Sequence, residues 1–197
     1  MSLISKTEQF VKNKHQGESS GHDWWHIEAV RKNALLIAQT ETCDLEVVEL
    51  AALLHDIADS KFHNGDHSAG ALVARDWLES QKLVEQKIEH ICKIIEKQSF
   101  SASSGILETI EAQIVQDADR LEALGAIGIA RCFAYGGKKG RLIYDPTGIT
   151  NQHSIQHFYD KLLTLIDLFN TEEGKKLAQP RHDFLKQFLD QFLNEWG

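Results

Sequence analysis

Proline is scarce in this sequence, with two residues in 197, so long stretches lack the residue that breaks helices. Cysteine is scarce as well, and Cys43, Cys92 and Cys132 form no CxxC pair. Their odd number and wide spacing indicate reduced thiols rather than a disulfide framework. No run approaches the ~18 apolar residues of a membrane span, and no N-terminal stretch has the basic-then-apolar order of a signal peptide. We therefore expect a cytoplasmic protein.

Positive charge is in the minority, because 21 lysines and arginines face 29 aspartates and glutamates, giving a formal net charge of −8. A chain with this balance lacks the basic surface that binds nucleic-acid polymers. It also lacks a polybasic patch for a membrane surface. We expect neither partner. Hydrophobic residues make up 42% of the chain, as in globular proteins, which excludes a disordered chain.

Strand-like alternation is almost absent, and apolar residues recur mostly at helical spacing. Between residues 23 and 40 they recur at steps of three and four. The run from Asp44 to Ile57 is apolar on most sides, which predicts a central, buried helix with Asp44 at its N-cap. Further helices are predicted near 66–80, 83–98, 105–135, 151–170 and 180–196, with Pro180 in a first helical turn and a glycine-rich loop at 136–148. The sequence therefore predicts an all-α protein.

The last predicted helix carries phenylalanines four residues apart, at 184, 188 and 192, beside leucines with the same spacing. This broad apolar face could complete the core or form the contact of a homodimer.

Two histidines stand out for their positions. His55, followed by Asp56, continues the face of the apolar helix that packs into the core upstream. Either the pair is held inside as a site, or the helix emerges into solvent here and His-Asp begins a loop. His26 shares a helix face with Val30 and Ile37 and therefore points inward, as a ligand or as a hydrogen-bonded core residue.

A carboxylate completes the set of unusual positions. Asp119 lies inside an apolar helical pattern, where a buried carboxylate needs a cation. That cation could be a metal ion, or Arg120 or Arg131. Together His26, His55, Asp56 and Asp119 offer two imidazoles and two carboxylates. This mixed set suits Mn²⁺, Fe²⁺, Ni²⁺, Co²⁺ or Mg²⁺ better than a closed zinc site, and it leaves positions open for water and substrate.

In order, these residues form the pattern H…HD…D, with the flanks HDWWHI, HDIADSKF, IVQDADRLEALGAIGIAR and YGGKKGRLIYDP. Over roughly residues 20–148, this pattern resembles the HD-domain metal-dependent phosphohydrolases, in particular their small bacterial branch. The resemblance implies one helical-bundle domain over residues 1–197, with a catalytic core at about 20–148 and C-terminal helices at about 150–197. It also implies one divalent ion, for which we favour Mn²⁺, held by the four residues.

The resemblance extends to further residues. Asp59 stands where nucleotidase members place an acidic residue that orients or activates the attacking water, and Lys61 could hold a phosphate oxygen. His22 and Asp23 resemble the family's entry to the first ligand helix; either could hold a ligand imidazole in place, and capping is the favoured role for Asp23. Among the other histidines, His90 is the best candidate for holding a ligand imidazole.

Two groups of basic residues bear on whether the chain can bind a phosphate group. Many family members have an arginine where this chain has Ala29, and Arg31 lies two residues further on. Lys138, Lys139 and Arg141 form the local basic cluster of the glycine-rich loop, which could neutralise a polyphosphate or remain solvated.

The resemblance implies hydrolysis of a phosphoester or phosphoanhydride in a small phosphorylated substrate, with a nucleotide favoured. Cleavage of a nucleoside triphosphate to a monophosphate and pyrophosphate ranks first. A phosphomonoesterase acting on nucleoside monophosphates or small phosphorylated metabolites is the alternative, and a non-catalytic, metal-bound nucleotide sensor is another. The HxxxH spacing of His22 and His26 also occurs in zinc peptidases, but Asp23 stands where those enzymes need a glutamate.

Overall fold

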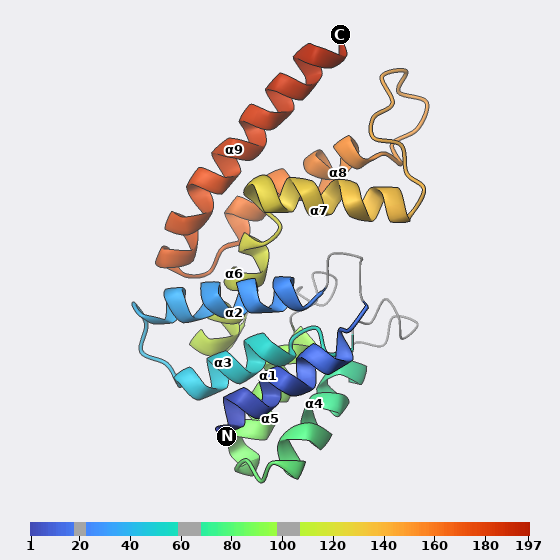
Figure 1. Cartoon of the computed structure of the whole chain (residues 1–197). Coiled ribbons are helices and arrows are strands. Elements are labelled where there is room, and N and C mark those ends of the chain that lie inside the picture. Colours follow the sequence, from blue (N-terminus) through green and yellow to red (C-terminus); the bar gives the residue numbers. More distant parts are fainter. Residues whose placement is uncertain (18–22, 59–67, 98–106) are drawn as a thin grey trace. The chain divides into compact units, whose positions relative to one another are not determined.

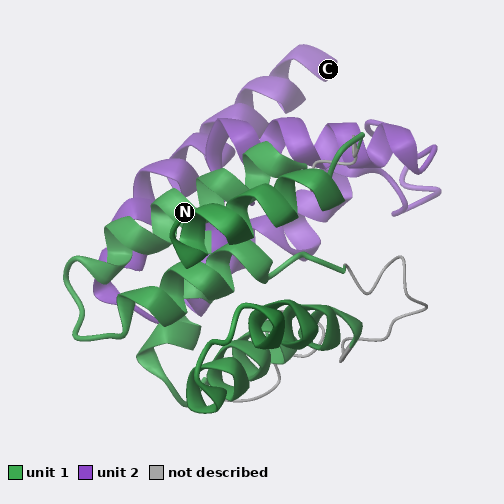
Figure 2. Cartoon of the chain, turned by 60° about the horizontal axis from the view of Figure 1, so that its bottom comes forward, with its two compact units in different colours: residues 1–18, 22–118 green, residues 19–21, 119–197 purple. Residues whose placement is uncertain are grey.

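The computed structural model describes residues 1–17, 23–58, 68–97 and 107–197. Helices and loops make up these ranges, in which no β-strand occurs, and the all-α prediction is confirmed (Figure 1). The chain divides into two compact units (Figure 2): the described residues up to Ala118 belong to unit 1, and those from Asp119 onward to unit 2. That the whole chain forms a single domain stays a prediction.

Unit 1 is a set of helices. In chain order they are α1 (Leu3–Lys14), α2 (Trp24–Ala38), α3 (Leu45–Leu54), α4 (Ser68–Ser80), α5 (Glu85–Lys97) and most of α6 (Ile110–Leu121). In the part of the chain that the structure describes, no helix is long and apolar enough to cross a membrane.

The α3 helix is the centre of unit 1. It packs against α1, α2 and α5. Its residues 47, 48 and 50–54 are buried, because its apolar side chains point in nearly every direction. Full burial of a leucine or valine side chain contributes about 1.5–3 kcal/mol, so the packing of this helix contributes strongly to the stability of the unit. The predicted central helix is therefore confirmed, although it ends at Leu54 rather than Ile57.

Side-chain caps fix where the two central helices begin. The Asp44 carboxylate accepts the backbone N–H groups of Glu46 and Val47 at the start of α3. The Asp23 carboxylate accepts the N–H of His26 at 3.1 Å at the start of α2, so the capping role of Asp23 is confirmed.

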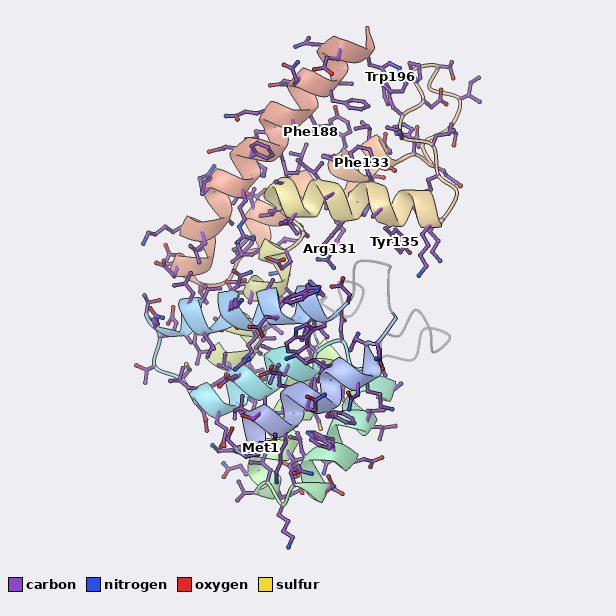
Figure 3. All side chains as sticks on the ribbon, in the orientation of Figure 1. Met1, Arg131, Phe133, Tyr135, Phe188 and Trp196 are labelled. Atoms are coloured by element: carbon purple, nitrogen blue, oxygen red, sulfur yellow. The ribbon has the colours of Figure 1, made fainter. Side chains whose placement is uncertain are left out.

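Unit 2 is built from α7 (Gly125–Lys138), α8 (Ser154–Asp160), a 3-10 helix η2 (Leu162–Leu168) and α9 (Glu172–Trp196). Aromatic rings hold these elements together. Phe133 of α7 lies 6.0 Å from Phe188 of α9, centre to centre, and Figure 3 shows both between their helices. Leu185 and Leu189 of α9 are buried, so this part of the helix completes the core of unit 2. Phe184 and Trp196 remain 44% and 46% exposed, and the homodimer contact stays a prediction.

The boundaries in unit 2 differ from those expected. Pro180 lies inside α9, which begins at Glu172, so its placement in a first helical turn was wrong. The helix continues through Pro180 without that residue's N–H group. The predicted helix at 151–170 is divided between α8 and η2.

Hydrogen bonds hold the loop between α7 and α8, residues 139–153, at its base and at its tip; we call it the braced loop. At its base, Ser154 and Ile155 donate backbone hydrogen bonds to the carbonyls of Leu142 and Ile143, at 2.9 and 3.0 Å. At its tip, the Asp145 carboxylate accepts the N–H groups of Thr147 and Thr150. The loop is therefore held by its own backbone and side chains.

Candidate metal centre

His26 is the third residue of α2. Its backbone is fixed by the Asp23 cap, and its side chain is only 2% exposed. The helical spacing that predicted an inward histidine is thus confirmed. The neighbouring Trp25, one step around the helix, is 73% exposed. The first turn of α2 therefore presents one side chain to the interior and one to solvent.

His55 follows directly on the last residue of α3, and its side chain is also 2% exposed. Its Nδ1 lies 2.8 Å from the carbonyl oxygen of Ala52. A carbonyl can only accept, so Nδ1 carries the proton and donates it. In the neutral ring, Nε2 then presents a lone pair. This hydrogen bond is the usual support for a metal-binding histidine, since it fixes both the tautomer and the orientation of the ring.

Asp56 brings a carboxylate to the two imidazoles. Its Oδ2 lies 3.5 Å from His26 Nε2 and 3.6 Å from His55 Nε2. The two rings meet edge to face, with centres 5.4 Å apart. One ligand atom from each of the three residues lies within 4.8 Å of the others. The structure therefore assembles three of the four predicted metal ligands.

The spacing of this cluster fits a metal ion. Bonds of about 2.1 Å put two ligand atoms about 3.0 Å apart at a right angle and about 3.4 Å apart at a tetrahedral angle. The separations of 3.5 and 3.6 Å are close to the tetrahedral value and longer than an ordinary hydrogen bond. Two imidazole nitrogens and one carboxylate oxygen form a donor set that binds divalent transition metals. The residues present fit such an ion.

Asp119, the predicted fourth ligand, lies in α6, two residues before the end of that helix, and is half-buried. Among the described residues it is the first of unit 2, whereas His26, His55 and Asp56 belong to unit 1. The α6 helix is continuous across this boundary. Coordination by Asp119 stays a prediction. Of the alternative arginine partners, Arg120 donates to the carbonyl of Leu168 and Arg131 to that of Glu122.

Three further predicted site residues, Asp59, Lys61 and His22, lie outside the described residues. Their roles stay predictions.

Arg31 lies two residues after Ala29 and contacts carboxylates of three helices. Its guanidinium donates to Glu49 Oε1 through Nη2 at 2.6 Å and Nε at 2.9 Å, and it contacts Glu28 and Glu8 at 3.2 and 3.4 Å. Burial lowers the pKa of Arg31, but the hydrogen bonds and charges of Glu49 and Glu28 outweigh it, so the pKa is raised. Arg31 joins three helices of unit 1, and its bonds to carboxylates take up the donors that a phosphate would need.

His90 lies near the other end of α3 from His55. Its Nε2 is 3.0 Å from Thr109 Oγ1 and 3.7 Å from Glu111, whose carboxylate accepts the backbone N–H of Asp44. Asp44 caps the start of α3 and His55 follows its end, so about 16 Å of helix separates them. A role for His90 in holding a ligand imidazole stays a prediction that these contacts do not support.

The basic cluster lies in unit 2. Lys138 is the last residue of α7, and Lys139 and Arg141 begin the braced loop. The Lys139 ammonium and the Arg141 guanidinium each lie 5.7 Å from the centre of the Tyr135 ring. Figure 3 shows Tyr135 near the end of α7. One aromatic ring thus gathers two cations, and their binding of phosphate stays a prediction.

Comparison with known families gives a match over this region. The HD domain family matches residues 24–124, from the start of α2 to just beyond α6. The match therefore includes the three clustered residues and Asp119.

Proteins from two Bacillus species match nearly the whole chain. The protein YpgQ of Bacillus subtilis is 39% identical, over 97% of this chain and 94% of its own length. A crystal structure of an HD-superfamily hydrolase from Bacillus thuringiensis is 47% identical, with a TM-score of 0.80, covering 98% of this chain and 96% of that one. The crystal structure of B. subtilis YpgQ in complex with ADP is 36% identical, with a TM-score of 0.83, covering 98% and 97%.

Proposed function

The chain belongs to the HD-domain family of metal-dependent phosphohydrolases, and from this premise we propose that its substrate is a nucleoside triphosphate. The reaction is the addition of water across the bond between the α- and β-phosphates. Its products are a nucleoside monophosphate and pyrophosphate.

The cluster of His26, His55 and Asp56 carries this proposal. Both imidazoles are buried, and the Ala52 carbonyl fixes the tautomer in which His55 Nε2 can bind a metal ion. A histidine that merely filled the core would need neither a second imidazole nor a carboxylate beside it. The nucleotide is supported by the YpgQ structure, because that relative binds ADP and matches this chain over nearly its whole length.

We assign Mn²⁺ to the cluster, because this ion binds carboxylate oxygen readily, accepts imidazole nitrogen as well, and with six coordination positions keeps some open for water and substrate. When bound, such an ion offsets the charge of a phosphoryl oxygen and lowers the pKa of a water molecule toward neutrality. His26, His55 and Asp56 hold the ion, and Asp119 is assigned as the fourth ligand. Asp59 holds or deprotonates the attacking water, as its position in the family pattern implies, and Lys61 holds a phosphate oxygen.

Lys138, Lys139 and Arg141 neutralise further phosphate charge in this proposal. The chain is acidic overall, so a polyanionic substrate depends on local cations. The shared contact with Tyr135 keeps Lys139 and Arg141 together.

The experiment uses metal-stripped protein, to which Mn²⁺, Mg²⁺, Co²⁺ or Ni²⁺ is returned singly, with a panel of nucleoside mono- and triphosphates. Pyrophosphate and phosphate are measured separately. We expect pyrophosphate release that depends on added metal and is lost in His55→Ala and Asp119→Ala. Bound metal is measured on the same samples.

Asp183→Ala is the matched control, because this exposed carboxylate of α9 bonds only to Gln179 among the described residues and should leave turnover unchanged. Release of phosphate in place of pyrophosphate would replace the proposal with a phosphomonoesterase. Metal binding without turnover of any nucleotide would leave a metal-bound sensor or an enzyme for other phosphorylated metabolites.

A further inference from the structure

Trp25 differs from the other tryptophans of unit 1, Trp24 and Trp77, in its side-chain contacts. Trp77 donates its indole N–H to Thr7 and stacks on Phe10 with ring centres 4.1 Å apart, and Lys12 lies over the Trp24 ring at 4.4 Å. Trp25 makes no ring contact or side-chain hydrogen bond with any described residue, and it is 73% exposed. Its indole face is therefore open to a ligand.

The position of this ring links it to the metal cluster. Trp25 directly precedes His26 in the first turn of α2, so the two side chains leave the helix one step of about 100° apart. The neighbours of Trp25 one turn further along are Glu28 and Ala29. The Glu28 carboxylate is engaged by Arg31 and Lys32, and Ala29 is only a methyl group. No large side chain on this face of α2 covers the indole.

We infer that Trp25 is the stacking platform for the nucleobase of the substrate. This inference rests on the proposed function, in which the phosphates lie at the cluster that contains His26. An aromatic ring beside a phosphate site distinguishes nucleotides from phosphorylated metabolites that carry no ring. Stacking accepts every base, because each has a π-face, so the platform selects for a base without selecting among bases.

The test compares ADP with inorganic tripolyphosphate, which carries phosphates but no base. Binding of each to the Mn²⁺-loaded protein is measured by calorimetry for wild type, Trp25→Ala, Trp25→Phe and Leu36→Ala. Leu36 is the matched control, since it is an exposed apolar residue of α2 eleven residues after Trp25, about 16 Å along the helix.

Removal of the ring in Trp25→Ala should weaken ADP binding about tenfold, in line with the loss of one base–aromatic stack, and leave tripolyphosphate binding unchanged. Trp25→Phe should retain most of the ADP affinity, and Leu36→Ala all of it. An ADP affinity changed by less than twofold in Trp25→Ala would overturn the inference. So would equal weakening of both ligands, because that result indicates a general disturbance of α2.

A turnover assay separates this inference from the proposed function. If wild type releases no pyrophosphate from any nucleotide but Trp25→Ala still weakens ADP binding selectively, the proposed reaction fails and the stacking platform stands. If wild type is active and Trp25→Ala has the same KM for ATP, CTP, GTP and UTP as wild type, the reaction stands and the platform fails.

Discussion

Arg31 joins α2, which carries His26, to α3, which His55 directly follows. It belongs to α2, five residues after His26, and its strongest partner, Glu49, belongs to α3, six residues before His55. The side chains of Arg31 and Glu49 are each 19% exposed. The substitution Arg31→Met keeps the apolar stem of the side chain and removes its charge and donors.

The expected loss of unfolding free energy follows from the geometry of the Arg31 contacts. A hydrogen bond to a charged group contributes about 1.5–3 kcal/mol when shielded, and an exposed ion pair about 0–1 kcal/mol. The double contact with Glu49 belongs to the first class, and the longer contacts with Glu28 and Glu8 belong nearer the second. We therefore expect Arg31→Met to cost about 3 kcal/mol, which lowers Tm by roughly 6–12 °C for a protein of this size.

Thermal and urea unfolding of wild type, Arg31→Met, Glu49→Gln and the double variant test this value. The double-mutant cycle should give a coupling free energy above about 1 kcal/mol between the two residues. A loss below 1 kcal/mol, or strictly additive single effects, would show that the contacts of Arg31 are ordinary surface pairs.

Three further perturbations give expected outcomes. Added Mn²⁺ at a hundred times its Kd should stabilise wild type by about 2.7 kcal/mol and leave Asp56→Ala unshifted in thermal melts; an equal shift in both would place the ion elsewhere. Gly136→Ala puts a methyl group onto Ser154 Oγ and should lower the free energy of unfolding in urea by about 1–3 kcal/mol. The second substitution Ser154→Ala should restore part of this loss, and a loss without such rescue contradicts the steric cause. Burial lowers the pKa of His182, so its contribution to stability is complete above pH ~6.5 and is lost as the pH falls through the lower folded value. His182→Gln should therefore flatten the decline of unfolding free energy below pH ~6.5, and an unchanged slope would assign that decline to other groups such as His157, whose pKa burial also lowers.

Periodicity predicted what depends on a single helix. The inward direction of His26, the burial of α3 and the place of His55 at its end follow from apolar spacing within one segment. The α1 helix was not predicted, because its exposed face mixes charged and polar residues and only Thr7 and Val11 are buried. Residues 105–135 were expected to form one helix, but the chain breaks before Gly125, whose φ of +68° suits glycine and interrupts α-helical geometry.

Contacts between helices were beyond prediction from spacing. The partners of Arg31 lie on α1, α2 and α3, separated by up to 23 residues, and only the packing of those helices brings them together. The Ala52 carbonyl that orients His55 is likewise invisible in the sequence, because every residue has a carbonyl and only the end of a helix leaves one available. The exposure of Trp25 had a signal in the sequence. It is an apolar residue on the polar side of its helix, and it directly precedes the candidate ligand His26.

The unequal exposure of the three clustered side chains has a kinetic consequence. The imidazoles of His26 and His55 are each 2% exposed, whereas Asp56 is 20% exposed. An ion arriving from solvent would meet the Asp56 carboxylate first and exchange hydration water for the imidazole nitrogens afterwards. Substitution of Asp56 should therefore slow the loading of the protein, and substitution of either histidine should speed the release of a bound ion. Exchange of one metal for another would call for local opening where α2 begins and α3 ends, with the core around α3 left folded.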